Sequence, residues 1–168
     1  MLSPHEDRLE RALRDQSVRD RYDAKVARAG RDDCWFWTGA IHPKGHGRFW
    51  VATFTDARSR EHDLVVIAHR FGWALAHGLD AMLAAPVLAH ECDEASCQNP
   101  RHVVPSTVAA NREDWLRRRW LPGSPLRDVR GPADRARAIR DALLTGEDPR
   151  AAMALGQPEV DDLQLPLW

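Results

Sequence analysis

The chain has 168 residues, a formal net charge of −1 and three cysteines. This length is enough for one domain with a modest core and a tail. No apolar run approaches the roughly 18 residues that a membrane span needs, and the charged start MLSPHEDRLERALRD is unlike a signal peptide. An odd cysteine count argues against a disulfide framework and suits a metal site in a reducing compartment. We therefore expect a soluble cytoplasmic protein.

Charge is unevenly distributed along the chain. Residues 101–140 carry ten basic and four acidic side chains, a balance of +6, whereas residues 141–168 carry one and six, a balance of −5. A basic segment beside an acidic tail is typical of a polyanion-binding face next to an end with another task. The arginines are equally compatible with a solvated helix face, and charge alone does not choose between the two.

The first predicted element is a helix over residues 3–29. Ser3 can cap it, Pro4 suits its first turn, and Glu6 completes a capping box. Two runs of i,i+4 spacing continue the helical pattern, namely Leu9 and Leu13, then Val18, Tyr22 and Val26. Gly30 can end the helix.

Short strands and a short helix are predicted in the middle of the chain. CWFWTGAIHPKGHGRFWVATFT indicates loop and strand, with a turn at residues 42–45 and strand alternation at Phe49 and Val51. The polar connection DARSREHD leads to a buried strand, LVVIA, and then to a short helix, HRFGWALAHG, that ends near Gly78. A further strand over residues 86–89 leads into AHECDEASCQNPRHVVPSTVAAN.

Three helices are predicted after this segment. The first covers VAANREDWLRRRW, with a hydroxyl cap in Pro105-Ser106-Thr107, and stops before Pro122. The linker LPGSPLRDVRGP precedes a helix over residues 132–145 and a short one from Asp148 to Gly156. We interpret these two as a plain helical pair rather than a trimmed helix-turn-helix, because no recognition helix of usable length follows.

The spacing of cysteine and histidine is the clearest chemical signal. Cys92, Cys97 and His102 follow one another at intervals of five residues. A structural zinc ion needs four thiolate or imidazole ligands, so these three need a fourth. Cys34 can complete a site that staples an early hairpin to a later loop. The alternative is that Cys34 is only a small buried apolar residue.

Two further residues flank these ligands. His90 lies two residues before Cys92, at the end of a predicted strand, and Asn111 lies in the first turns of the next helix. A neutral histidine is a suitable general base near pH 7, and an amide oxygen is a hard ligand suited to Mg²⁺. Each residue alone is more often structural or solvated. Together with the zinc spacing they indicate a phosphodiester-cleaving site.

The segment resembles the His-Cys box group of HNH-type homing endonucleases, which have the ββα-metal (His-Me finger) fold. The pattern His-x-Cys-x4-Cys-x-Asn-Pro-x-His, with Asn nine residues on, is matched by His90, Cys92, Cys97, Asn99, Pro100, His102 and Asn111. The stretches RYDAKV, CWFWTGA, GHGRF and AHRFGW also match phage-type members, so the resemblance covers roughly residues 20–115. Ala89 stands where many relatives have an acid, and Val103 replaces a more usual leucine. No cysteine remains for the second zinc that some relatives hold.

The resemblance implies an α+β fold, with a ββα-metal nuclease core stabilised by structural zinc and flanking N- and C-terminal helices. It implies a DNA endonuclease in which His90 activates water and Asn111 binds one catalytic Mg²⁺, giving 5′-phosphate and 3′-hydroxyl ends. Activity should fall at acidic pH as His90 protonates. The implied ligands of structural Zn²⁺ are Cys34, Cys92, Cys97 and His102.

The remaining implied roles concern positioning and DNA contacts. Asn99 and Pro100 would shape the turn between ligands, Asn99 would also be placed to orient His90, and His69 would support the fold. Arg48 is the candidate for contact with the scissile phosphate, and Arg58 and Arg60 could reach the same place. The helix arginines that could line double-stranded DNA are Arg112, Arg117, Arg118 and Arg119.

The predicted division of the chain is an N-terminal helix over residues 1–30, a zinc-stabilised nuclease domain over 31–121, a linker and helical pair over 122–156, and a disordered tail over 157–168. The tail ends in QLPLW, which resembles the peptide by which bacterial proteins dock on the DNA polymerase sliding clamp. The matching residues are Gln164, Leu165, Leu167 and Trp168. The alternative is that the tail folds back on its own domain.

Two other function classes remain open. One is a catalytically inactive, zinc-containing DNA-binding module, against which the presence of both His90 and Asn111 argues. The other is a structural zinc protein that binds a partner through QLPLW, against which the +6 region argues. A homodimer is also an open alternative, because enzymes of this group often act as dimers. The sequence itself indicates no dimer surface.

Overall fold

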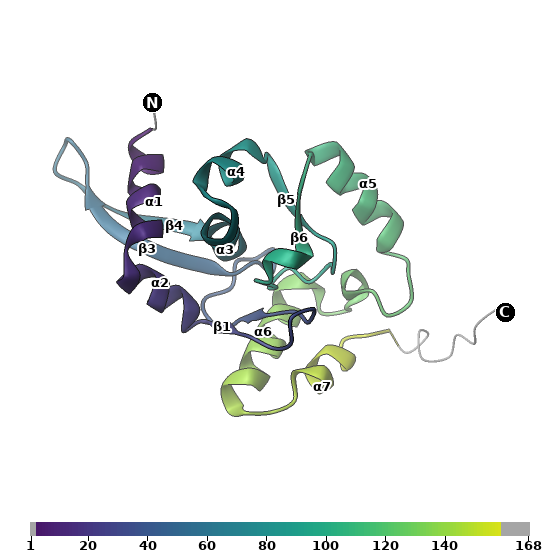
Figure 1. Ribbon diagram of the computed structural model, residues 1–168. Helices are drawn as coiled ribbons and strands as arrows, with labels where there is room; N and C mark the ends of the chain where they lie inside the picture. The colour runs from purple at the N-terminus through teal and green to yellow at the C-terminus, as the bar shows by residue number, and fades with distance from the viewer. Residues whose placement is uncertain (1–2, 159–168) are drawn as a thin grey trace.

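The computed structural model, which describes residues 3–158, has a mixed α+β fold (Figure 1). Its strands form three two-stranded antiparallel sheets. The pairs are β1 (Val26–Ala27) with β2 (Phe36–Trp37), β3 (Arg48–Thr55) with β4 (Glu61–Ile67), and β5 (Val87–His90) with β6 (Val103–Ser106). The α+β class that the sequence predicted is confirmed, whereas the assignment of a ββα nuclease core stays a prediction.

The N-terminal segment forms two helices and a strand, so the prediction of one helix over residues 3–29 was wrong. The capping box at Ser3 and Glu6 is present and starts α1 (Pro4–Arg14). The helix ends at Asp15, whose backbone is extended and whose carboxylate accepts the N–H of Ser17, which starts α2 (Gln16–Asp23). An aspartate that bonds to nearby backbone in this way competes with continuation of the helix.

An aromatic core lies between the N-terminal helices, the β3–β4 hairpin and α3 (Ala68–His77). Phe71 is fully buried, and its ring centroid lies 4.8 Å from that of Phe49 and 5.2 Å from that of Tyr22. The Tyr22 hydroxyl donates a hydrogen bond of 3.0 Å to Gln98 Oε1. The core therefore also anchors the segment that carries the cysteines.

The β3–β4 hairpin is longer than the sequence predicted. Phe49 and Val51 are buried, as the alternation indicated, but β4 begins at Glu61, inside the expected polar connection. The turn is held by Asp56, whose carboxylate accepts the backbone N–H groups of Arg58 and Arg60 at 2.8 and 3.0 Å. A carboxylate that satisfies turn amides allows the flanking residues to pair as strands.

Two short helices follow the hairpin. The predicted helix is α3, and it ends at Gly78, whose φ of 90° is in the region that favours glycine. The sequence did not indicate the next helix, α4 (Leu79–Ala84), which buries Leu79 and Met82 against the core. Six residues are too few to show a helical period.

The remaining helices follow the segment that carries Cys92 and Cys97, and α5 (Val108–Arg118) lies across the molecule from the hairpin (Figure 1). They are η1 (Pro100–His102), α5, η2 (Pro125–Arg127), α6 (Gly131–Thr145) and α7 (Pro149–Ala154). The helical pair expected near residues 132–156 is present as α6 and α7, which pack against each other. None of the helices among residues 3–158 is long and apolar enough to cross a bilayer. The QLPLW peptide lies outside the described residues.

Candidate metal centre and adjoining cavity

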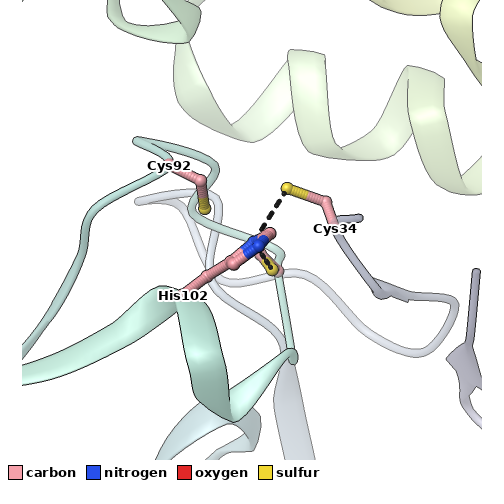
Figure 2. A group of neighbouring side chains, drawn as sticks. Cys34, Cys92 and His102 are labelled. Carbon is pink, nitrogen blue, oxygen red and sulfur yellow. Dashed lines mark hydrogen bonds between the residues drawn. The ribbon is translucent and has the colours of Figure 1, made fainter. Parts of the chain in front are cut away.

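Four side chains from three separate segments meet at one point. Cys34 precedes β2, Cys92 and Cys97 follow β5, and His102 ends η1. One ligand atom from each lies within 4.8 Å of all the others. Figure 2 shows Cys34, Cys92 and His102 pointing toward one another. The expectation that Cys34 joins the other three is confirmed.

The distances in this cluster fit a tetrahedral metal site. The Sγ atoms of Cys34 and Cys97 lie 3.5 and 3.6 Å from Nδ1 of His102. Zinc bonds of about 2.3 Å to sulfur and about 2.0–2.1 Å to nitrogen, at a tetrahedral angle, place sulfur and nitrogen about 3.5 Å apart. The cluster can therefore hold a metal ion with little rearrangement.

Hydrogen bonds around the cluster set the protonation of its nitrogen and sulfur atoms. Nε2 of His102 lies 3.0 Å from the carbonyl oxygen of Asp32, which only accepts, so Nε2 carries the hydrogen and Nδ1 turns its lone pair to the sulfurs. Hydrogen bonds from the thiols of Cys34 and Cys92 lower the pKa of Cys97 below that of a free thiol. Three sulfurs and one imidazole are the ligand set of structural zinc sites.

Asn99 fixes the turn between the ligands but does not orient His90. Its amide Nδ2 donates to the carbonyl oxygens of Arg31 and Asp33 at 2.9 and 2.8 Å, and its Oδ1 accepts the N–H of Arg101 at 3.0 Å. These bonds use both amide hydrogens and tie the Cys34 loop to η1. The expected role in the turn is confirmed, and the expected role in orienting His90 was wrong.

The orientation of His90 is set instead by Cys97, a residue of the candidate metal cluster. His90 is the last residue of β5, and its Nε2 lies 3.0 Å from the carbonyl oxygen of Cys97. Nε2 therefore carries the ring hydrogen, and Nδ1 is left with its lone pair. Burial lowers the pKa of His90, so the neutral ring is the favoured form.

His90 and Asn111 face one cavity of about 450 Å³. Lys44, Arg112 and Arg118 line the same cavity. The structure thus brings together the histidine and the asparagine that lie 21 positions apart in the sequence. Arg48 is exposed at the start of β3 and is not among the lining residues.

The hairpin arginines lie elsewhere. Arg58 and Arg60 belong to the turn at the end of the β3–β4 hairpin, and Arg60 pairs with Asp56 at 2.9 Å. A strand rises about 3.3 Å per residue, so the turn lies roughly 20 Å from the start of β3. Arg58 and Arg60 therefore do not reach the place of Arg48, contrary to the expectation. Figure 1 shows the hairpin turn on the opposite side of the molecule from α5.

Three of the four helix arginines have partners within the protein. Arg117 pairs with Asp114 at 2.5 Å, and Arg118 donates to the carbonyl oxygen of Glu91 at 2.9 Å. The Arg119 guanidinium lies 4.2 Å from the ring centroid of Trp115. The Arg112 side chain is exposed and makes no hydrogen bond or ion pair with any residue from 3 to 158.

A buried ion-pair cluster joins α6 to the segment that carries Cys92 and Cys97. Arg135 donates from Nε to Glu94 Oε1 at 3.0 Å and from Nη1 to Asp128 Oδ2 at 3.0 Å. Burial raises the pKa of Glu94 although Arg135 opposes the shift. No sequence signal predicts this cluster, because Arg135 and Glu94 lie 41 positions apart and belong to no recognisable spacing pattern.

Two histidines near His90 were not expected to take part in a site. His46, in the turn before β3, and His69, in the first turn of α3, each have a nitrogen within 4.8 Å of the other and of a nitrogen of His90. His69 was expected only to support the fold. The signal that could have indicated the group is the recurrence of histidine in GHGRF and AHRFGW, immediately before and after the hairpin.

No family model and no solved structure matches the chain. Two proteins of Escherichia phage T7 are similar to it. Protein 7.7 is 31% identical over 85 residues, which cover 51% of this chain and 56% of the phage protein. Protein 2.8 is 30% identical over 95 residues, which cover 55% of this chain and 53% of the phage protein. The chain thus spans about half the length of the curated relatives it matches, and these similarities assign no activity to it.

Proposed function

We propose that the protein is a zinc-stabilised, Mg²⁺-dependent DNA endonuclease of the HNH type. The observation that carries the proposal is the relation of His90 to the cavity. Its Nε2 is fixed by the carbonyl oxygen of Cys97, and the residue lines the same cavity as Asn111. A neutral imidazole held in one orientation beside a hard oxygen ligand is suited to hydrolysis of a phosphodiester.

Zinc, held by Cys34, Cys92, Cys97 and His102, would supply structural stability rather than chemistry. Four protein ligands leave no open position for water, as in structural sites. The four residues come from segments up to 68 positions apart. Their closure fixes the turn that carries the Cys97 carbonyl, and with it the ring of His90.

His90 is the general base in this proposal. Its Nδ1 takes a proton from a water molecule that attacks the phosphorus atom. The Nε2–H bond to the Cys97 carbonyl then stabilises the imidazolium that forms. Because the step needs the neutral ring, the cleavage rate should decrease in acid. The ends would be a 5′-phosphate and a 3′-hydroxyl.

Asn111 is the residue that would hold Mg²⁺. Its side-chain amide lines the cavity and makes no hydrogen bond to any residue from 3 to 158. Mg²⁺ keeps several waters and needs only one or two protein oxygens, so a single free amide oxygen fits it. When bound, Mg²⁺ would supply positive charge at the phosphate and the leaving oxygen.

Lys44 and Arg112 are better placed than Arg48 to bind the DNA phosphates. Both line the cavity with His90, and neither pairs with a carboxylate among residues 3–158. An unpaired cation beside the reacting group can stabilise phosphate charge without breaking an existing ion pair. Arg48 remains the candidate that the family resemblance favours.

Cleavage of supercoiled plasmid by zinc-loaded protein and Mg²⁺ tests the proposal. We expect nicked or linear DNA from the wild type, none in the presence of a chelator, and a loss of at least about 100-fold for His90→Ala or Asn111→Ala. His62→Ala, on the exposed hairpin, is the matched control and should cleave normally. Equal cleavage by His90→Ala would reject the assigned base.

If folded, zinc-loaded wild type cleaves neither plasmid nor a broad sequence library, the proposal fails and the DNA-binding module becomes the better reading. Docking of QLPLW on a sliding clamp and formation of a homodimer stay predictions of the sequence. A synthetic peptide ending in QLPLW tests the first by titration onto purified clamp. Absence of binding at high micromolar concentration would reject it.

A further inference from the structure

Three histidine rings lie close together, and two of them, His46 and His90, line the cavity. They come from the turn before β3 (His46), the first turn of α3 (His69) and the end of β5 (His90). The ring centroid of His69 lies 4.5 Å from that of His90 and 5.1 Å from that of His46. One nitrogen from each ring lies within 4.8 Å of the other two, the same limit that the Cys34 cluster meets.

Each ring uses one nitrogen to contact the backbone. Nδ1 of His46 lies 3.0 Å from the Ala95 carbonyl oxygen, and Nε2 of His90 lies 3.0 Å from that of Cys97. His69 donates to the backbone carbonyl oxygen of Leu88. Metal-binding histidines usually donate their other N–H to a carbonyl in this way, which fixes the tautomer and points the free lone pair at the metal.

His69 adds an independent sign of a missing ligand. It is only 6% exposed, and its Nδ1 has no hydrogen-bond partner among the described residues. A buried polar atom without a partner is costly and uncommon in native proteins. Burial also lowers the pKa of His46 and of His69, so both rings offer lone pairs at neutral pH.

We propose that His46, His69 and His90 bind one divalent transition-metal ion, such as Zn²⁺ or Co²⁺. Three neutral imidazoles suit these ions, whereas Mg²⁺ and Ca²⁺ prefer oxygen ligands. The three ligands would leave a fourth position for water, and two of them, His46 and His90, line the cavity. The site is separate from the Cys34 cluster, with which it shares no residue.

The site has a consequence for the proposed nuclease. A metal ion on Nδ1 of His90 occupies the lone pair that would accept the proton of water. A transition-metal ion should therefore inhibit Mg²⁺-dependent cleavage. This consequence rests on the proposed function, whereas binding of the metal does not.

Titration of Co²⁺ into the full, tag-free chain already loaded with one zinc tests the site. We expect one further equivalent of Co²⁺, retained on gel filtration, with weak visible bands and without the intense near-ultraviolet absorption of cobalt thiolates. That absorption would instead report exchange of cobalt into the cysteine cluster. Wild-type protein that binds no second ion, or that binds it only with thiolate absorption, would overturn the proposal.

His46→Gln is the principal variant, because His46 is only partly buried and belongs to a turn. The affinity for Co²⁺ should fall by at least about 10–100-fold, the cost of losing even an outer partner of a ligand. His62→Gln, on the hairpin, should bind as the wild type does. Unchanged affinity in His46→Gln would contradict the proposal. His90→Gln provides a second variant, and zinc content with near-ultraviolet circular dichroism checks that each variant is folded.

Measurement of DNA cleavage in the presence of Co²⁺ distinguishes failure of the metal-site proposal from failure of the nuclease proposal. If the wild type cleaves DNA, Co²⁺ should inhibit it at concentrations that fill the second site, and His46→Gln should resist this inhibition. Equal inhibition of the wild type and His46→Gln would show that Co²⁺ does not inhibit cleavage by binding to His90 at this site. If the wild type does not cleave DNA, the nuclease proposal fails, but binding of Co²⁺ still decides the metal site.

Discussion

The guanidinium of Arg135 on α6 is buried against the carboxylate of Glu94, with Nε 3.0 Å from Oε1. Both side chains are 5% exposed. Glu94 lies between Cys92 and Cys97, so this pair connects the C-terminal helices to the segment that carries two thiols of the metal centre. The same helix lines the cavity that contains His90. The C-terminal region thus contributes to the geometry of the site.

Replacement of Arg135 by Met should destabilise the protein by about 3–5 kcal/mol, because it leaves the buried Glu94 without its cation. Urea unfolding of zinc-loaded protein measures the change. Arg137→Met, which removes only an exposed pair with Asp134, should cost no more than about 1 kcal/mol. Adding Glu94→Gln to Arg135→Met should recover part of the loss. An equal effect of the two arginine variants would contradict this account.

Removal of one metal ligand should release zinc and loosen the fold. We expect Cys34→Ser to lose stoichiometric zinc and at least about 3 kcal/mol of stability, or about 6–12 °C in Tm. A strong chelator should have the same effect on the wild type and little further effect on the variant. Zinc content and thermal unfolding check both statements. The zinc assignment would be rejected if the purified wild type contained no metal and its Tm did not change on addition of the chelator.

Gly47 should tolerate no side chain. A Cβ there would lie 2.6 Å from the ring of Trp37 and 2.9 Å from Cβ of Ala68. Since Trp37 is fully buried and cannot move away, Gly47→Ala should cost about 1–3 kcal/mol. Gly30→Ala is the contrast, because its Cβ would meet only the end of the Asp33 carboxylate, which can rotate. Chemical denaturation of both variants should show the larger loss for Gly47→Ala.

Arg112 should contribute more to DNA binding than its neighbours on α5, if the protein binds DNA as proposed. Arg112→Gln should weaken binding to duplexes of any sequence and reduce the slope of log K against log salt by about 1. Arg117→Gln should have a smaller effect, because Arg117 already pairs with Asp114. Fluorescence anisotropy at several salt concentrations measures both. A larger loss for Arg117→Gln would contradict the assignment.

The sequence by itself determined those features that depend on local chemistry. Caps and turns follow from a few adjacent residues, so the capping box at Ser3 and the start of α6 were predictable. The metal cluster was predictable because Cys92, Cys97 and His102 have ligand spacing and Cys34 is the one other cysteine. Prediction of helices from the spacing of apolar residues failed in two situations. One side chain interrupts the helical period at Asp15, and α4 is too short to show a period.

Only the tertiary structure decided which residues meet across long separations. It placed Lys44 and Arg112, but not Arg48, among the residues that line the cavity, bound Asn99 to the Cys34 loop, and brought His46 and His69 to His90. It also buried Glu94 against Arg135. Such contacts depend on how the hairpin, α3 and α6 pack together. Packing is a collective result of the whole core, and no short stretch of sequence encodes it.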